Sequence, residues 1–338
     1  MNKILTVVVP VYKVEQYINK CLGSLVVPEE LMGLLEVIVV NDGTPDNSAI
    51  MAKEFEKKFP HTFRVIDKEN GGHGSCCNVG LREAKGKYIH FLDSDDWFDE
   101  NFPLYLEKLA KEDADVVFTH CVKEFAKSGI SKVHSLKLEY DKQYEFRTIP
   151  FDLLTHDTFS LHECSYSVDL LRKNEIAFLE RCSYDDTILR LAPIPLVKQI
   201  SLYDLSLYHY LLEREGQSMD KKVFAKKLPQ LLENIRSLFE HCNNVEKELD
   251  EATQQFCQKV LNSYIMYFWG SIWILRKNIL DCYRKFCLTH NIFHQDENAH
   301  WLHHLGLVRS CNKYSAPIAF LHYLYCIKSR RIGLFFPC

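Results

Sequence analysis

The sequence has 338 residues, of which 47% are hydrophobic and 25% are charged, a composition typical of a soluble globular protein. This length exceeds one domain of roughly 100–200 residues, so we expect a core domain with an extension. The formal net charge of -4 argues against a generally basic nucleic-acid-binding protein, and we expect no nucleic-acid partner.

Strand and helix signals alternate over the first ~120 residues, which indicates βαβ units and a mainly parallel sheet. After residue 120 the periodicity weakens, and from about residue 221 the pattern is mostly helical. We therefore predict an α/β domain over 1–218 and a helical extension over 219–338. In chain order, the expected elements are a strand at 6–9, a helix at 14–26, a strand at 36–40, a helix at 47–59, a strand at 63–67, a glycine-dense loop at 70–75, a helix at 76–84, a strand at 88–92 and a strand at 115–119.

Thirteen cysteines are scattered along the chain, and several lie in apolar stretches. The apolar run at 4–9 is too short for the core of a secretory signal, so free thiols in a cytoplasmic protein are the simpler interpretation. The apolar stretch at 261–275 is uncharged for 15 residues, which is shorter than the ~18–20 that span a bilayer. We expect a cytoplasmic protein, with peripheral contact to the inner face of the membrane as an open alternative.

An acidic tetrapeptide (DSDD, residues 93–96) directly follows the fourth predicted strand. Side chains two residues apart on an extended chain point the same way, so Asp93 and Asp95 can converge on one cation. Carboxylates are the ligands that Mg²⁺ and Mn²⁺ prefer, usually together with substrate phosphates. Open parallel sheets bind ligands at this end of their strands. The alternative is an acidic turn in which Asp96 caps a helix over 97–109.

Four segments resemble, in the same order, the motifs of the family 2 glycosyltransferases. They are TVVVPVY at 6–12, EVIVVNDGT at 36–44, NGGHGS at 70–75 with Asn78 after it, and YIHFLDSDDW at 88–97. Four segments in one order are far more specific than any one alone. The resemblance implies a GT-A fold: a Rossmann-like, mostly parallel sheet flanked by helices, with the nucleotide over its carboxyl edge.

The resemblance also implies which residues surround the nucleoside. Pro10, Val11 and Tyr12 would line the base pocket, and Glu15 would lie near the nucleoside. Asp42 would accept a hydrogen bond from the base or the ribose.

On the diphosphate side, the resemblance implies that Asp95, together with Asp93, holds Mn²⁺ or Mg²⁺, with Asp93 also near the ribose or sugar. Lys68 would approach the base or the diphosphate. Arg214 and Ser218 match a segment that closes over the diphosphate, although a surface loop with a solvated arginine is the alternative. Three further donor-site residues come from the same motifs: Gly72, Asn78 and Ser94.

Inverting transfer needs a general base that takes the proton of the acceptor hydroxyl. The family's base lies in an acidic pair downstream of the metal motif, and the matching stretch here is SYDDT at 183–187. The resemblance assigns the base to Asp186, with Asp185 as the second candidate. A helix cap or a pair of surface acids is the alternative.

We therefore predict a metal-dependent, inverting glycosyltransferase that uses a nucleotide-sugar donor, with UDP-sugar favoured, and a saccharide or lipid-linked saccharide acceptor. Bacterial cell-surface polysaccharide synthesis is the expected setting. The extension is expected to contact the acceptor, a second copy of the chain or the membrane. Two alternatives stay open: a catalytically silent nucleotide-sugar-binding partner subunit, and a nucleotidyltransferase, although the glycine- and lysine-rich first loop expected of the latter is missing after Val9.

Overall fold

A computed structural model describes residues 3–150, 153–154 and 158–214, with scattered positions between 223 and 261. The chain divides into two compact units, Met1–Phe224 and Ala225–Cys338. Most described positions of the second unit are helical. The expected boundary at residue 218 lies outside the described residues, so the predicted division at that point stays a prediction.

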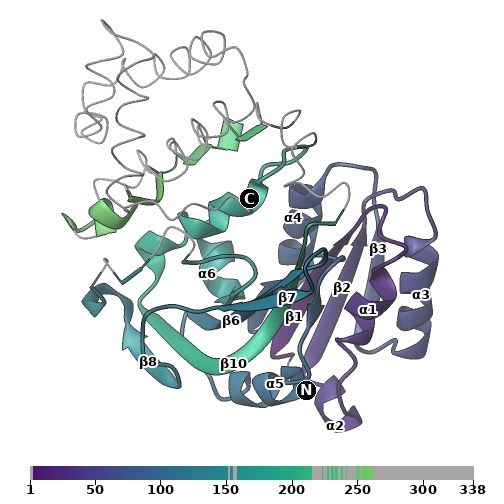
Figure 1. Cartoon of the computed structure of the whole chain (residues 1–338), viewed down its shortest axis with the longest axis horizontal. Helices are drawn as coiled ribbons and strands as arrows, with labels where there is room; N and C mark the ends of the chain where they lie inside the picture. Colours follow the sequence, from purple (N-terminus) through teal and green to yellow (C-terminus); the bar gives the residue numbers. More distant parts are fainter. Residues whose placement is uncertain are drawn as a thin grey trace, which may run out of the picture. The chain divides into compact units, whose positions relative to one another are not determined.

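One mixed sheet forms the centre of the first unit, with the strand order β3-β2-β1-β4-β9-β6-β10-β5 among the described residues (Figure 1). The four strands β3, β2, β1 and β4 pair in parallel, as the alternating sequence pattern predicts. Beyond β4 the pairing is mixed, β7 adds to β6, and β8 adds to β10. The strands are β1 (Leu5–Val11), β2 (Leu35–Asn41), β3 (Phe63–Asp67), β4 (Tyr88–Phe91), β5 (Trp97–Phe98), β6 (Val116–Phe125), β7 (Ile130–His134), β8 (Lys142–Glu145), β9 (Cys164–Ser167) and β10 (Gln199–Leu212).

Helices cover both faces of the sheet because alternate side chains of its buried strands point to opposite sides. Leu5, Val7 and Val9 of β1 belong to the core that includes residues of α1, α2, α3 and α5. Val8 of the same strand contacts Gly80 of α4, and α6 packs beside α4. The helices are α1 (Ile18–Gly23), α2 (Glu29–Met32), α3 (Ser48–Lys58), α4 (His73–Glu83), α5 (Phe102–Leu109) and α6 (Val168–Lys173), and the 3-10 helices are η1 (Phe146–Thr148), η2 (Asp185–Arg190) and η3 (Ile194–Leu196).

Replacing Gly80 with alanine is expected to destabilise the fold by about 1–3 kcal/mol, the usual cost of overpacking a core. A Cβ atom at Gly80 would lie 2.3 Å from Val8 Cγ1, so α4 must move away from β1. Denaturant unfolding measures the effect. Gly23→Ala is the matched control, because a Cβ there meets nothing within 4 Å. Equal stability of the two variants would contradict close packing of α4 on β1.

Several sequence-based element boundaries are wrong, including the strand expected over 115–119, which extends to Phe125. The helix expected over 14–26 is confined to Ile18–Gly23. The helix expected from residue 76 begins at His73, directly after Gly72, whose φ is 86°. The helix expected over 97–109 begins only at Phe102, because Trp97 and Phe98 form β5 and pair with β10. Asp96 therefore caps no helix.

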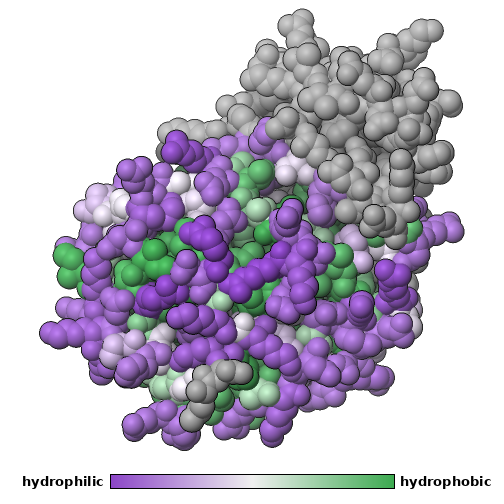
Figure 2. All heavy atoms as spheres, turned by 180° about the vertical axis from the view of Figure 1, so that it is seen from behind, coloured by the Kyte–Doolittle hydropathy of each residue, from purple (hydrophilic) through white to green (hydrophobic). Residues whose placement is uncertain are grey.

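Hydrophilic side chains cover most of the described surface on the face drawn in Figure 2, with small hydrophobic patches between them. The exposed large hydrophobic side chains are scattered along the chain: Tyr12, Val26, Ile50, Leu104, Ile130 and Val133. Every helix in the described part of the chain is too short or too polar to cross a membrane. The apolar stretch at 261–275 lies almost wholly outside that part.

Candidate active site

The acidic turn after β4, residues 93–96, is held by hydrogen bonds from β10, which comes much later in the chain. The Tyr208 hydroxyl donates to Asp96 Oδ2 at 2.7 Å and accepts from the backbone N–H of Asp93 at 3.1 Å. The backbone N–H of Leu211 donates to Asp96 Oδ1 at 2.8 Å. Burial, followed by the charges of Asp95 and Asp93, raises the pKa of Asp96 well above its usual value. Both oxygens of this buried carboxyl thus hold the turn in place.

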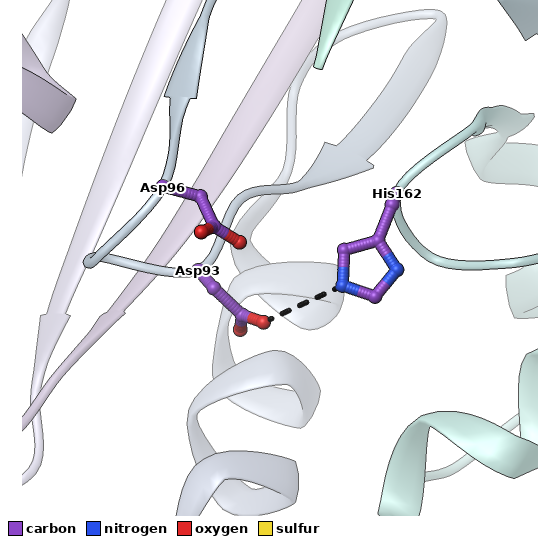
Figure 3. Close-up of side chains that lie close together, drawn as sticks. All are labelled: Asp93, Asp96 and His162. Carbon is purple, nitrogen blue, oxygen red and sulfur yellow. Dashed lines mark ion pairs between the residues drawn. The ribbon is translucent and has the colours of Figure 1, made fainter. Parts of the chain in front are cut away.

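Asp93, Asp96 and His162 bring one possible ligand atom each to within 4.8 Å of one another. Figure 3 shows the His162 ring directed at the Asp93 carboxylate, and His162 Nε2 lies 3.9 Å from Asp93 Oδ2. The His162 ring also stacks on Tyr210, with centroids 4.3 Å apart. Carboxylate oxygens suit Mg²⁺ and Mn²⁺, and a single imidazole is compatible with a transition metal such as Mn²⁺. The donor set therefore fits a divalent cation.

Asp95, the expected metal ligand, pairs with a protein cation. Its Oδ2 atom accepts from the Arg214 guanidinium, and its side chain is 12% exposed. Burial and the nearby charge of Asp93 raise the pKa of Asp95, while Arg214 opposes that shift. Asp95 is not part of the Asp93–Asp96–His162 group, so an ion shared by Asp93 and Asp95 stays a prediction. The structure brings Arg214 to the acidic turn, and its expected contact with phosphate stays a prediction.

Asp42, the expected base or ribose ligand, organises the glycine-rich loop. Its two carboxylate oxygens accept from the backbone N–H groups of Gly71 and Gly72, each at 2.8 Å, and Lys68 Nζ donates to it at 2.7 Å. Lys68 Nζ also donates to Ser75 Oγ at 2.8 Å. These contacts fix the loop against the end of β2. The expected contacts of Asp42, Lys68 and Gly72 with the donor stay predictions.

The residues expected around the base lie at the carboxyl end of β1. Pro10 and Val11 are buried within the strand, and Tyr12 follows it with 44% of its surface exposed. Glu15 accepts from the backbone and side-chain amides of Asn47 at 3.2 and 2.9 Å. The expected contacts of these residues with a base or nucleoside stay predictions.

Two other expected donor-site residues make mainly internal contacts. Asn78 Oδ1 accepts from the Phe178 N–H at 2.8 Å, and Asn78 Nδ2 donates to the Phe178 carbonyl at 3.0 Å. Ser94 is buried in the acidic turn. Asn78 therefore ties α4 to the segment that leads to η2, and its expected donor contact stays a prediction. Ser218 lies outside the described residues.

Asp185 and Asp186, the expected general-base pair, begin η2 and face different surroundings. Asp185 is buried, and its Oδ2 lies 2.8 Å from His73 Nδ1. The side chain of Asp186 is 27% exposed, with its Oδ2 3.6 Å from a terminal nitrogen of Arg190. Burial raises the pKa of Asp186, and Arg190 opposes the shift. Asp186 is thus more accessible than Asp185, and its pKa is higher than that of an ordinary aspartate. Asp185 is held by its contact with His73.

His73 links this acidic pair to the acidic turn, with Nε2 3.1 Å from Asp93 Oδ1. Burial alone would lower the pKa of His73, but Cys77, Asp185 and Asp93 raise it well above the usual value. Burial raises the pKa of Cys77 to about 11, so its thiol is neutral near pH 7. The carboxylates of Asp185 and Asp93 are therefore the charges that stabilise protonated His73. The contact also lowers the pKa of Asp93, against the opposing effect of its own burial.

Sequence reasoning assigned no role to His73, His162 or Tyr208 in this site. His73 and Asp185 are 112 positions apart, as are Tyr208 and Asp96, and His162 lies about 70 positions from Asp93 and Asp96. For His73 the only local signal is its place in a glycine-rich loop, and glycines often occur where a backbone approaches a ligand closely. No local pattern marks His162, whereas Tyr208 belongs to the stretch that resembles the family segment closing over the diphosphate.

Residues 6–174 match the family model described as glycosyl transferase family 2. The chain belongs to this family. It is 28% identical over 259 residues to the putative glycosyltransferase EpsH of Bacillus subtilis, covering 72% of each protein. It is 29% identical over 227 residues to the minor teichoic acid biosynthesis protein GgaB of Bacillus subtilis, covering 66% of this chain and only 24% of GgaB.

Two solved structures share the fold of this glycosyltransferase. S. aureus TarS 1-349 in complex with UDP-GlcNAc superposes with a TM-score of 0.68 at 22% identity, covering 86% of this chain and 81% of TarS. The mannosyltransferase PcManGT from Pyrobaculum calidifontis, in complex with GDP-Man and Mn²⁺, gives a TM-score of 0.52 at 14% identity, covering 99% of this chain and 88% of that one. The fold is therefore GT-A, as predicted.

Proposed function

We propose that this family 2 glycosyltransferase moves a sugar from a nucleotide diphosphate, preferably UDP, to an acceptor hydroxyl with inversion at the anomeric carbon. The observation that carries the proposal is that His73 contacts both Asp93 of the acidic turn and Asp185 of η2, although these two residues are remote in sequence. A single displacement at the sugar requires a site for the donor diphosphate and a general base close to each other.

In this proposal Asp186 accepts the proton of the acceptor hydroxyl as the oxygen attacks the anomeric carbon. Its partial exposure lets an acceptor reach it, and its raised pKa makes it a stronger base than a solvated carboxylate. Because one nucleophile replaces one leaving group on the opposite face, the configuration inverts. Arg214, released from Asp95, would bind the donor diphosphate with its planar guanidinium.

The residues proposed to hold Mn²⁺ or Mg²⁺ are Asp93 with Asp95, or Asp93 with Asp96 and His162. A bound divalent ion supplies neutralisation of the charge that develops on the departing diphosphate. The support is the oxygen-rich donor set and the Mn²⁺ in the complex of PcManGT, which has the same fold. Asp93 belongs to both candidate ligand sets and is 31% exposed, so it is open to a ligand.

UDP is favoured over GDP because TarS, the structure with the higher TM-score, binds UDP-GlcNAc. A cell-surface saccharide or lipid-linked saccharide is the proposed acceptor, supported by the teichoic acid role in the name of GgaB. The proposed place of action is the cytoplasm or the inner face of the membrane. The second unit is proposed to contact the acceptor, a second copy of the chain or that membrane.

Calorimetric titration of the full chain with UDP, GDP and CDP, each with Mn²⁺ and with EDTA, tests the donor class. We expect metal-dependent binding of UDP and weaker binding of the other two. Sugar conjugates of the nucleotide that binds are then screened for transfer, and NMR of the product anomer tests inversion. Binding of none of the three with or without metal would refute the proposed donor site.

The pH dependence of kcat/KM should show an acidic limb set by Asp186. Only the deprotonated carboxylate can accept a proton, so activity falls as the pH drops through its pKa. Because that pKa is raised, the limb should lie at higher pH than the usual aspartate value near 3.8. A pH–rate profile with a saturating metal concentration measures it. Activity that stays constant down to about pH 4 would contradict this assignment.

A further inference from the structure

The His73 side chain contacts both acidic segments of the site through its two ring nitrogens. Nδ1 lies 2.8 Å from Asp185 Oδ2, and Nε2 lies 3.1 Å from Asp93 Oδ1. These carboxylates belong to the start of η2 and to the turn after β4, which are separate in sequence. The imidazole ring of His73, the first residue of α4, therefore bridges the two segments.

The backbone around His73 is packed closely against the segment that enters η2. A Cβ atom at Gly74 would lie 2.3 Å from the Leu179 carbonyl and 2.7 Å from Asp185 Oδ2. The backbone N–H of Arg181 donates to the Gly71 carbonyl at 2.7 Å. The first turn of α4 thus lies directly against the chain that enters η2, which places His73 beside Asp185.

Asp93 and the acidic pair have different chemical tasks in the proposed function, on which this inference rests. Asp93 belongs to the cation and donor side, whereas Asp186, next to Asp185, takes the acceptor proton. A general base must lie within hydrogen-bond reach of the acceptor hydroxyl, and a misplacement of about 1 Å costs about 100-fold in rate. Some group must therefore set the distance between the two sides.

We propose that His73 is a positioning residue that couples the donor side of the site to the base side by hydrogen bonding to Asp93 and Asp185 at once. It does not touch the reacting atoms. It places η2, and with it Asp186, at a fixed distance from the turn that binds the donor. Loss of either end of the ring should therefore disturb one side of the site, and loss of the ring should disturb both.

Three substitutions at His73 separate its two ends. In His73→Asn the side-chain amide replaces Nδ1, which keeps the contact with Asp185 and loses the contact with Asp93. In His73→Gln the amide reaches the Nε2 position, which keeps the contact with Asp93. In His73→Ala both contacts are lost. His61→Ala, at an exposed histidine, is the matched control.

Nucleotide affinity and kcat are measured on the full chain, with UDP and Mn²⁺ as the calorimetric probe. We expect His73→Asn to weaken UDP binding about 10-fold while largely keeping kcat, and His73→Gln to lower kcat about 10-fold while largely keeping affinity, because hydrogen bonds to charged groups contribute at about this level. His73→Ala should lose both, and His61→Ala neither. Thermal unfolding of each variant separates these effects from a loss of folded protein.

A double-mutant cycle tests the coupling itself. Asp185→Asn should lower kcat about 10-fold in the presence of His73, as His73→Gln does, and have no further effect in His73→Ala. Equal effects of Asp185→Asn in both backgrounds, or wild-type affinity and kcat in all three His73 variants, would overturn the inference. If Asp95→Ala and His162→Ala also bind UDP with Mn²⁺ like the wild type, the proposed function itself falls; if either loses binding, only the coupling by His73 does.

Discussion

Replacing Asp186 with asparagine is expected to lower kcat for sugar transfer by about 100-fold to 10,000-fold, the usual contribution of a general base. Asparagine nearly preserves the size of the side chain but cannot accept the acceptor proton. Nucleotide affinity should change little, because no donor contact is assigned to this residue. Steady-state transfer assays and calorimetry with UDP and Mn²⁺ measure the two quantities.

Asp169→Asn is the control for that experiment, since its carboxylate is 75% exposed and pairs with Lys173 on the same helix. A kcat for Asp186→Asn within about twofold of the control would remove Asp186 as the base. If Asp185→Asn then lowered kcat by at least about 100-fold while keeping UDP affinity, the base would be Asp185. A loss of about 10-fold in kcat that does not occur in the His73→Ala background is instead the result expected from its contact with His73.

Replacing Asp95 with alanine is expected to weaken Mn²⁺-dependent UDP binding by at least about 10-fold, because the side chain is proposed to hold the ion that neutralises the diphosphate. The substitution also frees Arg214, which gains access to phosphate and keeps part of the metal-independent affinity. Calorimetry with Mn²⁺ and with EDTA separates the two effects. In the variant, the difference between the two conditions should nearly vanish.

His162→Ala is the matched experiment for the metal ligands. If the ion lies between Asp93, Asp96 and His162, this variant loses the metal-dependent part of UDP binding and Asp95→Ala keeps it. If the ion lies between Asp93 and Asp95, the outcome is reversed. Either result identifies the ligand set, and a wild-type metal response in both variants would contradict a cation site at this turn.

The parallel half of the sheet could be predicted from the sequence because its signals are local. Buried parallel strands are nearly continuous apolar runs, and β1, β2 and β4 are such runs followed by turn or acidic residues. The acidic turn and the glycine-rich loop come directly after predicted elements, so their positions at one edge followed from the strand order. The family resemblance added the acidic pair of η2.

What the sequence did not predict depends on contacts between distant segments. Trp97 and Phe98 have the apolar character of a helix start, and only pairing with β10 makes them a strand. The pairing of Asp95 with Arg214, which lies 119 positions further along the chain, has no local signal either. His73 gains Asp185 as a partner only when η2 packs on α4, and Asp93 only when the turn after β4 lies beside the start of α4. Single-sequence periodicity carries no information on such tertiary pairing.

The position of β10 has a consequence for how the protein can be divided. The family match ends at residue 174, yet β10, at Gln199–Leu212, is an internal strand bonded to β5, β6 and β8. A fragment cut at the end of the match would leave the edge of β6 that faces β10 unpaired, and such edges promote aggregation. It would also lose Tyr208 and Leu211, which hold Asp96. The smallest unit that can fold with its acidic turn intact therefore extends at least to Arg214, forty residues beyond the family match.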